Sequence, residues 1–425
     1  MRTLNVSIER EGKLVPAGMI CGEGSSDARF QYSDSYLSDP KAAALSVSLP
    51  LTEKPYSARQ TRTFFEGLLP EGFTRLSVAQ WMHFDERDYL SILHALGREC
   101  IGAISVTEED EKVEESYTKL TKEQVRELAA EGAEKSAELV TKAHLSLTGA
   151  SGKVGLYHSG NSNSWYLPGG TAPSTHIVKQ SHVRLDAIVT NEQLSLITAR
   201  RCGIEVPHSF IINTGKGTER EVLFATERYD RFFPKEQRLV NGLPCPMRLH
   251  QEDFAQAMGI PSSEKYGHGS DSYLKEMFDI LRRYSSNPIA DQLRLWDTIV
   301  FDFLIGNTDA HIKNFSLLYG TDLKEIRLAP VYDLVSTTVY EQSTRDMAFC
   351  IGGAYSVDEL TEEHFRRAAG EAGIGERIAM LRFFRMRDQF RAALHQSAEE
   401  LSAQGYQKAA WLEDKILSGG GIRNV

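Results

Sequence analysis

The sequence lacks the features that mark several large classes of protein. Its five cysteines are scattered and never form a C-x-x-C pair; they are Cys21, Cys100, Cys202, Cys245 and Cys350. This spacing argues against a disulfide framework or a structural zinc site and is typical of a reducing compartment. No stretch approaches the ~18 apolar residues that a membrane-spanning helix needs. The first fourteen residues also lack the apolar run of a secretory signal. We therefore expect a cytoplasmic protein without membrane contact.

An excess of positive charge is missing too. The 48 Lys and Arg residues face 58 Asp and Glu residues, which gives a formal net charge of −10. Such a chain has no overall attraction to nucleic acid or to an anionic membrane. A local basic patch is still compatible with this charge, but we expect any DNA contact to come indirectly, through a partner. With 425 residues, the chain is too long for one hydrophobic core, so two or three packed units are expected.

The first hundred residues have the pattern of a small α/β unit. Apolar residues from Leu4 to Ile8 alternate with polar ones, which predicts a half-buried strand, and Leu45 to Leu51 is a second candidate strand. Helical spacing between Tyr89 and Leu96 predicts a helix that Gly97 ends. The acidic run 107–116 is typical of a solvated boundary. We therefore expect residues 1–106 to form an N-terminal subdomain.

The middle of the chain is rich in strand patterns, and the rest is helical. Strands are predicted at Leu145–Leu167 (two, with a turn), Thr175–Lys179, Phe210–Ile212 and Val222–Glu227, and a helix capped by Thr190 and Gln193 lies among them. We expect residues 107–231 to form a β-rich lobe and residues 232–425 a helical lobe. Clefts between lobes are favoured ligand sites.

The segment Gly306-Asn-Thr-Asp-Ala-His-Ile-Lys-Asn-Phe315 is the most informative in the chain. It follows an apolar helix, so Asp309 and Asn314 lie on a loop that a rigid element holds. Phosphoryl transfer needs a carboxylate that orients the attacking hydroxyl and an amide oxygen that holds magnesium nearby. Asp333, in Pro330-Val-Tyr-Asp333, can supply a second metal ligand. The alternative is a solvated, capped turn for Asp309 and Asn314, and a helix N-cap for Asp333.

Three weaker signals precede that loop. The small residues of Ser146-Leu-Thr-Gly-Ala-Ser-Gly-Lys153 let a backbone approach a phosphate, although this is not a Walker A loop and most such turns are plain hairpins. Lys179 ends a strand and can hold the α- and β-phosphates, with Glu192 orienting it. Glu227-Arg-Tyr-Asp-Arg231 joins the two lobes, where backbone groups can meet an adenine edge. Solvated surface charges and an ordinary linker are the alternatives, but the order of all these signals is the one that a kinase needs.

These residues resemble the HipA family of kinases, the toxins of bacterial toxin–antitoxin pairs. The resemblance rests on Asp309-Ala-His-Ile-Lys-Asn314 with Pro330-x-Tyr-Asp333, and on further motifs over nearly the whole chain; these are Ser48–Leu51, Phe64–Pro70, Gly97–Gly102, Thr175–Lys179, Glu227–Asp230, Arg248–Asp253 and Pro261–Tyr266. It implies an α+β, two-lobed protein-kinase-like fold with an extra N-terminal α/β subdomain.

The resemblance also implies roles for single residues. Asp309 is the expected catalytic base, and Asn314 and Asp333 are the expected Mg²⁺ ligands. The residues expected to bind ATP are Gly149, Ala150, Ser151, Gly152, Lys153, Lys179, Glu227, Arg228, Tyr229, His311 and Tyr332. Ser146 matches a serine that family members autophosphorylate, and a phosphate there would silence the enzyme through its negative charge. The family loop reads Gly-Ala-Gln-x-Lys, whereas this chain has Gly149-Ala-Ser-Gly-Lys153, so Thr148 and Ser151 remain alternative acceptors.

The expected activity is transfer of the ATP γ-phosphate to a serine or threonine of a protein. The resemblance implies an aminoacyl-tRNA synthetase as the target and a HipB-like helix-turn-helix antitoxin as the partner that contacts DNA. Two other functions compete with this interpretation. One is a catalytically idle, antitoxin-binding scaffold, and the other is a kinase for a lipid or a small molecule.

Overall fold

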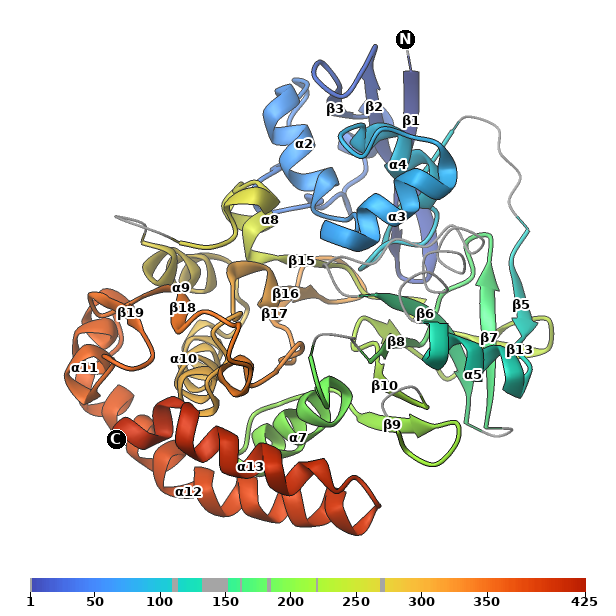
Figure 1. Cartoon of the computed structure of the whole chain (residues 1–425). Helices are drawn as coiled ribbons and strands as arrows, with labels where there is room; N and C mark the ends of the chain where they lie inside the picture. The colour runs from blue at the N-terminus through green and yellow to red at the C-terminus, as the bar shows by residue number, and fades with distance from the viewer. Residues whose placement is uncertain are drawn as a thin grey trace.

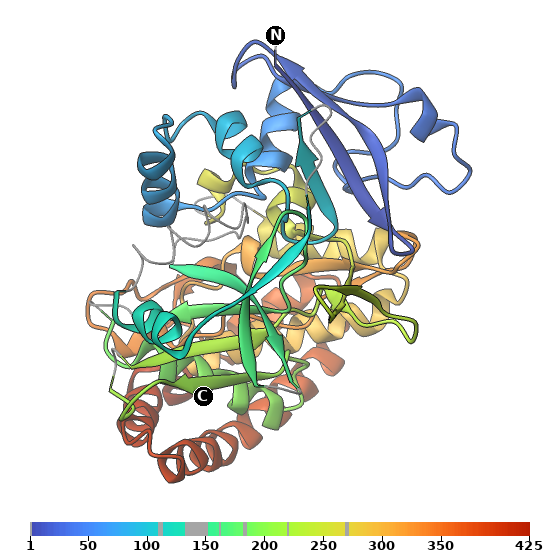
Figure 2. The same ribbon diagram turned by 90° about the vertical axis from the view of Figure 1, so that its right-hand side faces the viewer.

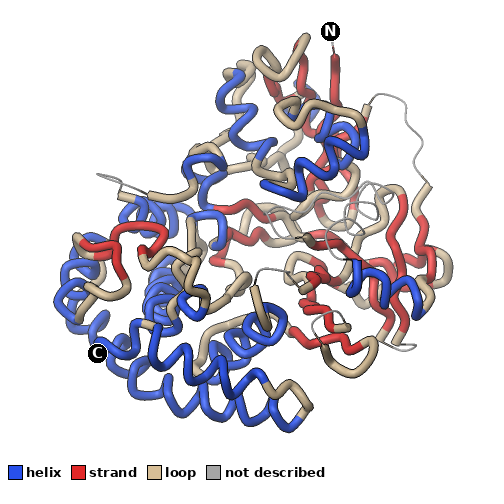
Figure 3. Tube along the Cα trace, in the orientation of Figure 1, coloured by secondary structure: helices blue, strands red, loops and turns tan. Residues whose placement is uncertain are grey.

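The computed structural model describes residues 2–108, 114–131, 152–160, 163–181, 185–218, 221–267 and 272–425. They form an α+β fold with two lobes and an additional N-terminal subdomain, which lies at the top in Figure 1. Strands gather in that subdomain and in the β-rich lobe, and helices dominate the other lobe (Figure 3). Among the helices of the described residues, none combines the length and apolarity that crossing a bilayer requires.

The N-terminal subdomain is an antiparallel sheet with helices packed on it. The strand order is β3-β2-β1-β4, with β1 at Arg2–Arg10, β2 at Lys13–Gly22, β3 at Arg29–Tyr32 and β4 at Ile104–Thr107. The helices are α1 (Asp34–Leu37), α2 (Ala58–Glu66), α3 (Gly72–Met82) and α4 (Tyr89–Leu96). The alternation in the first strand is confirmed, because Leu4, Val6 and Ile8 are all buried.

The strand predicted at Leu45–Leu51 is wrong. This segment has one isolated bridge, between Ser46 and Leu49. Its polar groups bond to a distant carboxylate instead of a neighbouring strand, since the Val47 N–H donates to Glu252 Oε1 at 3.0 Å and the Ser46 hydroxyl donates to Glu252 Oε2. The apolar side chains of Leu45 and Leu49 are buried all the same.

The β-rich lobe contains a sheet of order β5-β7-β6-β8-β10-β9. Its elements are β5 (Ser116–Lys119), α5 (Lys122–Glu131), β6 (Lys153–Ser159), β7 (Ser164–Gly169), β8 (His176–Gln180), α7 (Ile188–Arg201), β9 (Ser209–Asn213) and β10 (Val222–Glu227). Helix α7 begins at Ile188, before the predicted cap at Thr190, because the Asn191 N–H already bonds to the Ala187 carbonyl at 2.8 Å. This helix packs against β9 and β10 on one side and against the helical lobe on the other.

Short strands connect the three parts. They are β11 (Arg231–Phe232), β12 (Arg238–Val240), β13 (Leu243–Cys245), β14 (Met247–Arg248), β15 (Gln251–Asp253), β16 (Ser316–Tyr319) and β17 (Ile326–Leu328). Strands β15, β16 and β17 form one small sheet, which lies between the N-terminal subdomain and the helices in Figures 1 and 2.

The other helices of the helical lobe pack around α10, and the aromatic residues of α10 lie in the core of the lobe. Its elements are α8 (Phe254–Met258), α9 (Tyr273–Tyr284), α10 (Pro288–Ile305), β18 (Asp346–Ile351), β19 (Ala354–Ser356), α11 (Glu362–Glu371), α12 (Glu376–Ala403) and α13 (Lys408–Gly419). Trp296, Phe301 and Phe303 are completely buried. The helix α10 ends at Gly306, as predicted, because this glycine adopts a left-handed backbone with φ 76°. The next residues form the loop with Asp309.

Candidate active site

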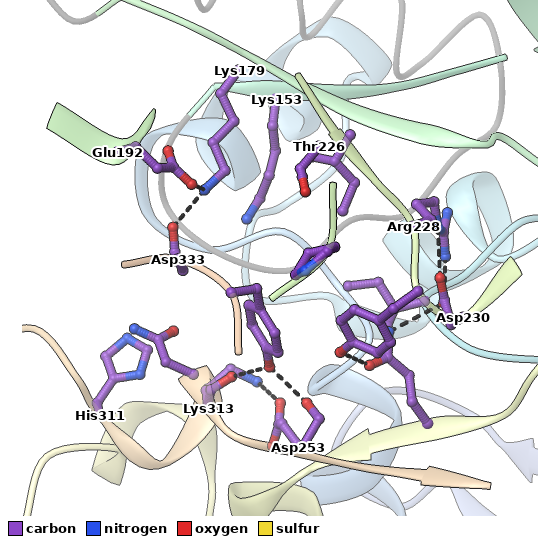
Figure 4. A pocket seen from close by; sticks show the side chains of 18 of the residues that line it. Lys153, Lys179, Glu192, Thr226, Arg228, Asp230, Asp253, His311, Lys313 and Asp333 are labelled. Atoms are coloured by element: carbon purple, nitrogen blue, oxygen red, sulfur yellow. Dashed lines mark hydrogen bonds and ion pairs between the residues drawn. The ribbon is translucent and has the colours of Figure 1, made fainter. Parts of the chain in front are cut away.

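A cleft of about 250 Å³ lies where the three parts of the chain meet. Its wall contains Leu68, Glu71 and Ile101 from the N-terminal subdomain, Lys153, Lys179 and Glu192 from the β-rich lobe, and Asp309, His311, Asn314 and Asp333 from the helical lobe. Residues that are up to 265 positions apart in the sequence therefore line one hollow, whose inner side chains are drawn in Figure 4.

Lys179 is the central cation of this cleft. Its Nζ atom lies 2.6 Å from Glu192 Oε1 and 2.5 Å from Asp333 Oδ1. Strand β8 positions the lysine and helix α7 positions the glutamate, so this contact joins the sheet, the helix and the loop after β17 (Figure 4). We call Lys179, Glu192 and Asp333 the cleft cluster. Burial raises the pKa of Glu192 to about 7, against the attraction of the neighbouring ammonium group.

Asp333 has an unusual backbone and a carboxylate that stays ionised. Its φ is 58°, in the left-handed region that non-glycine residues rarely adopt and that is often found at functional sites. Burial opposes ionisation, but the ammonium groups of Lys179 and Lys153 outweigh it and hold the pKa of Asp333 well below its usual range. Lys153, which pairs with Lys179 across strands β6 and β8, loses hydration by burial, and its pKa falls to about 8.

Asp309 lies on the loop after α10, and the loop folds back on itself. The N–H of His311 bonds to the Asp309 carbonyl at 2.7 Å, and the Asn314 side-chain amide bonds to the same oxygen at 2.9 Å. The carboxylate accepts a hydrogen bond of 2.5 Å from the Tyr266 hydroxyl. Although the side chain faces the cleft, surrounding protein atoms reduce its hydration, and this burial raises the pKa of Asp309.

Comparison with known proteins identifies the family of this chain. Residues 12–107 match the family described as HipA N-terminal domain, and residues 145–401 match the family described as HipA-like C-terminal domain. The chain belongs to the HipA family of kinases. It is 33% identical over 411 residues to the putative kinase Y4mE of Sinorhizobium fredii. The aligned region covers 95% of this chain and 93% of the relative.

Two further comparisons are with HipA of Shewanella oneidensis. The serine/threonine-protein kinase toxin HipA is 28% identical to this chain, over 78% of it and 75% of the relative. A solved structure titled as the complex of HipA, HipB and its operator DNA superimposes with a TM-score of 0.79 and 21% identity, over 97% of this chain and 96% of that one. This likeness confirms the predicted two-lobed kinase-like fold with its N-terminal subdomain.

The aromatic residues predicted to bind ATP lie together in this HipA-family protein. The rings of Tyr229 and Tyr332 stack with centroids 5.7 Å apart. The Tyr332 hydroxyl donates to the Lys313 carbonyl at 2.9 Å, which ties the ring to the Asp309 loop. His311 is 7% exposed, and its Nδ1 has no partner among the described residues. Burial lowers the pKa of His311 to about 3, so the imidazole is neutral.

The segment that joins the two lobes divides its side chains between the cleft and the interior. The Glu227 side chain is 53% exposed. The Arg228 guanidinium, in contrast, is 1% exposed and bonds to Glu99 Oε1 at 3.0 Å and Asp230 Oδ2 at 2.8 Å. Arg231 contacts the same two carboxylates. We call Glu99, Arg228, Asp230 and Arg231 the hinge cluster. Figure 4 shows Arg228 turned toward Asp230, so this arginine borders the cleft without presenting its charge to it.

Several residues at the site received no role from the sequence. Lys313 Nζ lies 2.5 Å from Asp253 Oδ2 and 3.5 Å from Glu71 Oε1, and Lys265 Nζ lies 2.8 Å from Glu71 Oε2. Tyr266 contacts Asp309, as described above. Asp253, Lys265 and Tyr266 belong to motifs that carry the family resemblance, which was the available signal. No pattern pointed to Glu71.

The predicted glycine-rich loop lies mostly outside the described residues. Ser146, Thr148, Gly149, Ala150 and Ser151 belong to this part, so their predicted roles stay predictions. Gly152 directly precedes β6, and Lys153 is the first residue of that strand and lines the cleft.

The donor atoms fit a magnesium ion that is shared with phosphate. Within the described ranges, no group of three or more His, Cys, Asp or Glu residues is arranged to hold a metal by itself. Mg²⁺ usually takes one or two carboxylates and completes its shell with water and substrate phosphates. Asp333 offers such a carboxylate. Asn314 uses its amide nitrogen to hold the loop, so its oxygen is the atom that it can offer to a cation.

Proposed function

We propose that this chain is an ATP- and Mg²⁺-dependent protein serine/threonine kinase. One observation carries the proposal: Lys179, Asp309, Asn314 and Asp333, which the sequence predicts for phosphoryl transfer, line the same cleft. Phosphoryl transfer depends mainly on positioning and on electrostatic stabilisation, and these side chains supply both.

In this proposal each residue has a distinct task. Asp309 orients the acceptor hydroxyl and takes its proton while the hydroxyl oxygen bonds to the γ-phosphorus and ADP leaves. Its raised pKa suits a group that has to accept a proton. Asp333 and Asn314 would hold Mg²⁺, which neutralises charge on the phosphate oxygens when it is bound. Lys179 holds the α- and β-phosphates.

Nucleotide binding then requires the cleft cluster to change partners. Asp333 now bonds to the Lys179 ammonium at 2.5 Å. The phosphates would bind the Lys179 ammonium, and the metal would bind the Asp333 carboxylate. Each charged side chain would then again face a group of opposite charge. Glu192 contacts the other side of the ammonium at 2.6 Å and keeps Lys179 directed into the cleft throughout.

We place the adenine at the segment that joins the lobes. The Thr226 hydroxyl contacts the Glu227 carbonyl at 3.5 Å, too far for a strong hydrogen bond, so we propose that this carbonyl accepts a bond from the adenine amine. Apolar side chains of Ile101, Ile177, Leu196 and Phe224 line the same cleft and suit a flat ring. Glu227, Arg228 and Tyr229 contribute mainly through their backbone.

The test uses the purified full-length protein with Mg²⁺ and ATP labelled on the γ-phosphate. We expect phosphate to appear on serine or threonine of the chain itself or of proteins in a cell lysate. Asp309→Asn should reduce transfer at least about 100-fold and still bind ATP, because Asp309 faces the acceptor. Asp279→Asn, on the exposed face of α9, is the matched control and should transfer normally.

Other results would select a different function. ATP binding without any transfer would indicate an idle scaffold that retains the fold. Transfer to a lipid or a small molecule, with no labelled protein, would indicate a different acceptor class. A chain that fails to bind ATP with Mg²⁺ would contradict the assignment of Lys179 and Asp333.

The finer biological role rests on the family resemblance and belongs to the same proposal. We propose a toxin that arrests growth by phosphorylating a protein such as an aminoacyl-tRNA synthetase, with self-inactivation through Ser146 in the glycine-rich loop. The proposed partner is a HipB-like antitoxin, since a related structure is titled as a complex of HipA, HipB and operator DNA. We assign it to the cytoplasm and divide it at residues 106 and 231.

A further inference from the structure

The Tyr266 hydroxyl occupies a hydrogen-bonding position on Asp309, the proposed catalytic base. It donates to Asp309 Oδ1 at 2.5 Å. A serine or threonine that is to be phosphorylated must make the same kind of bond to this carboxylate before it loses its proton. The tyrosine is 37% exposed at the cleft, so an incoming side chain meets it directly.

The ring of Tyr266 is held from two sides. It packs edge-on against His311, with centroids 5.2 Å apart and planes at 80°. The Lys265 ammonium lies 5.5 Å from the centre of the same ring. These contacts fix the direction of the hydroxyl, so its bond to Asp309 belongs to a defined arrangement.

The N-terminal subdomain holds this arrangement in place. Lys265 Nζ pairs with Glu71 Oε2 at 2.8 Å, and both side chains are 15% exposed. A continuous line of contacts thus runs from Glu71 in the subdomain through Lys265 and Tyr266 to Asp309. The backbone after the tyrosine is anchored as well, because the Gly267 N–H bonds to the Ala348 carbonyl at 2.8 Å.

We propose that Tyr266 is an acceptor-site gate, which a substrate serine or threonine displaces from Asp309, and that the Glu71–Lys265 ion pair latches it. The inference rests on the proposed kinase function and deepens it. The gate lets only those protein segments react that displace Tyr266, which the Glu71–Lys265 pair holds in place. The N-terminal subdomain thereby selects substrates for the helical lobe.

The experiment measures ADP release by the full-length protein with Mg²⁺, ATP and a library of peptides that contain serine and threonine. Tyr266→Phe keeps the ring and removes the hydroxyl. We expect the KM for peptide to fall about tenfold, since a substrate no longer has to replace a hydrogen bond to a carboxylate. The kcat should not decrease. Tyr284→Phe, on the exposed side of α9, should match the wild type.

The latch is tested with Lys265→Gln. It should lower the KM for peptide in the same direction, by a smaller factor, and add nothing in a Tyr266→Phe background. Such non-additivity identifies residues that act through one another. If the two effects add fully, Lys265 contacts substrate independently and the latch is refuted.

Each remaining outcome decides one point. A lower kcat in Tyr266→Phe with unchanged peptide KM would make Tyr266 a residue that orients the base, which overturns the gate. Phosphotyrosine at position 266 in the wild type would make it an acceptor itself and overturn the gate too. If the wild type is active and Tyr266→Phe has the same kcat and KM for peptide, the gate proposal is wrong and the kinase proposal stands. If neither protein uses ATP, both proposals are wrong.

Discussion

The hinge cluster and the cleft cluster are both built from buried ion pairs, yet they differ in closure. In the hinge cluster, two arginines face two carboxylates, and every side chain is at most 2% exposed. In the cleft cluster, Lys179 is 11% exposed and Asp333 35%. The hinge cluster is balanced in charge, and its charged groups are almost completely shielded from solvent. The cleft cluster opens onto a cavity, where a ligand can replace one charge by another.

This difference separates a structural task from a functional one. The closed, balanced hinge cluster joins the N-terminal subdomain, through Glu99, to the segment between the lobes. Removing one of its charges costs much folding free energy, because the remaining charges stay buried. An open cluster costs less to break and is free to rearrange. The same residue types therefore serve stability in one place and, in our proposal, phosphate and metal binding in the other.

Breaking the hinge cluster should have the largest effect. Glu99→Ala leaves Arg228 and Arg231 with one carboxylate between them, and we expect the free energy of unfolding to fall by about 3–5 kcal/mol. Urea denaturation measures it. Lys275→Ala removes an exposed ion pair on α9 and should cost less than about 0.5 kcal/mol. A loss below about 1 kcal/mol in Glu99→Ala would show that water reaches the cluster.

Breaking the cleft cluster should mainly affect activity. Asp333→Asn removes a proposed magnesium ligand, and we expect phosphoryl transfer to fall at least about 100-fold and to need more Mg²⁺. The free energy of unfolding should change by no more than about 1 kcal/mol, because the side chain is partly exposed. A magnesium titration of transfer, with urea denaturation alongside, measures both. Unchanged transfer would contradict the metal assignment.

A buried carboxyl without a cation sharpens the comparison. Asp302, in α10, accepts a hydrogen bond from the Asn307 amide at 2.8 Å, and no cation lies against it in the described part of the chain. Burial raises the pKa of Asp302 to about 8. The native state therefore keeps a proton that an unfolded aspartate releases near pH 4.

Stability should accordingly fall as pH rises from about 4 to about 8, by up to about 1.4 kcal/mol per pH unit from this group, and level off above. Asp302→Asn stays neutral and keeps the bond to Asn307, so it should lack this slope. Urea denaturation at several pH values between 5 and 9 compares the two proteins. A difference that does not vary with pH would mean that Asp302 is ionised in the native state.

Local sequence was sufficient for many of the elements and for the order of the chemical groups, although the strand that it predicted at Leu45–Leu51 is wrong. The strand at Val222–Glu227 and the end of α10 at Gly306 follow from a short apolar run and from a glycine stop, which are properties of neighbouring residues. Asp309 and Asn314 were predicted because they lie five positions apart on a loop after an apolar helix, and Asp333 because it follows a short strand pattern. Their shared cleft was an expectation from a kinase-like order of motifs.

Only the tertiary structure decided which distant side chains meet. Arg228 was predicted to bind the nucleotide, but its guanidinium bonds to Glu99, 129 positions earlier in the chain. Lys265 pairs with Glu71 across 194 positions, and this places Tyr266 on Asp309. An ion pair between distant segments carries no periodicity and no spacing rule, because its energy depends on where two separate elements pack. The sequence identified the charged residues, whereas the fold determined which of them form ion pairs.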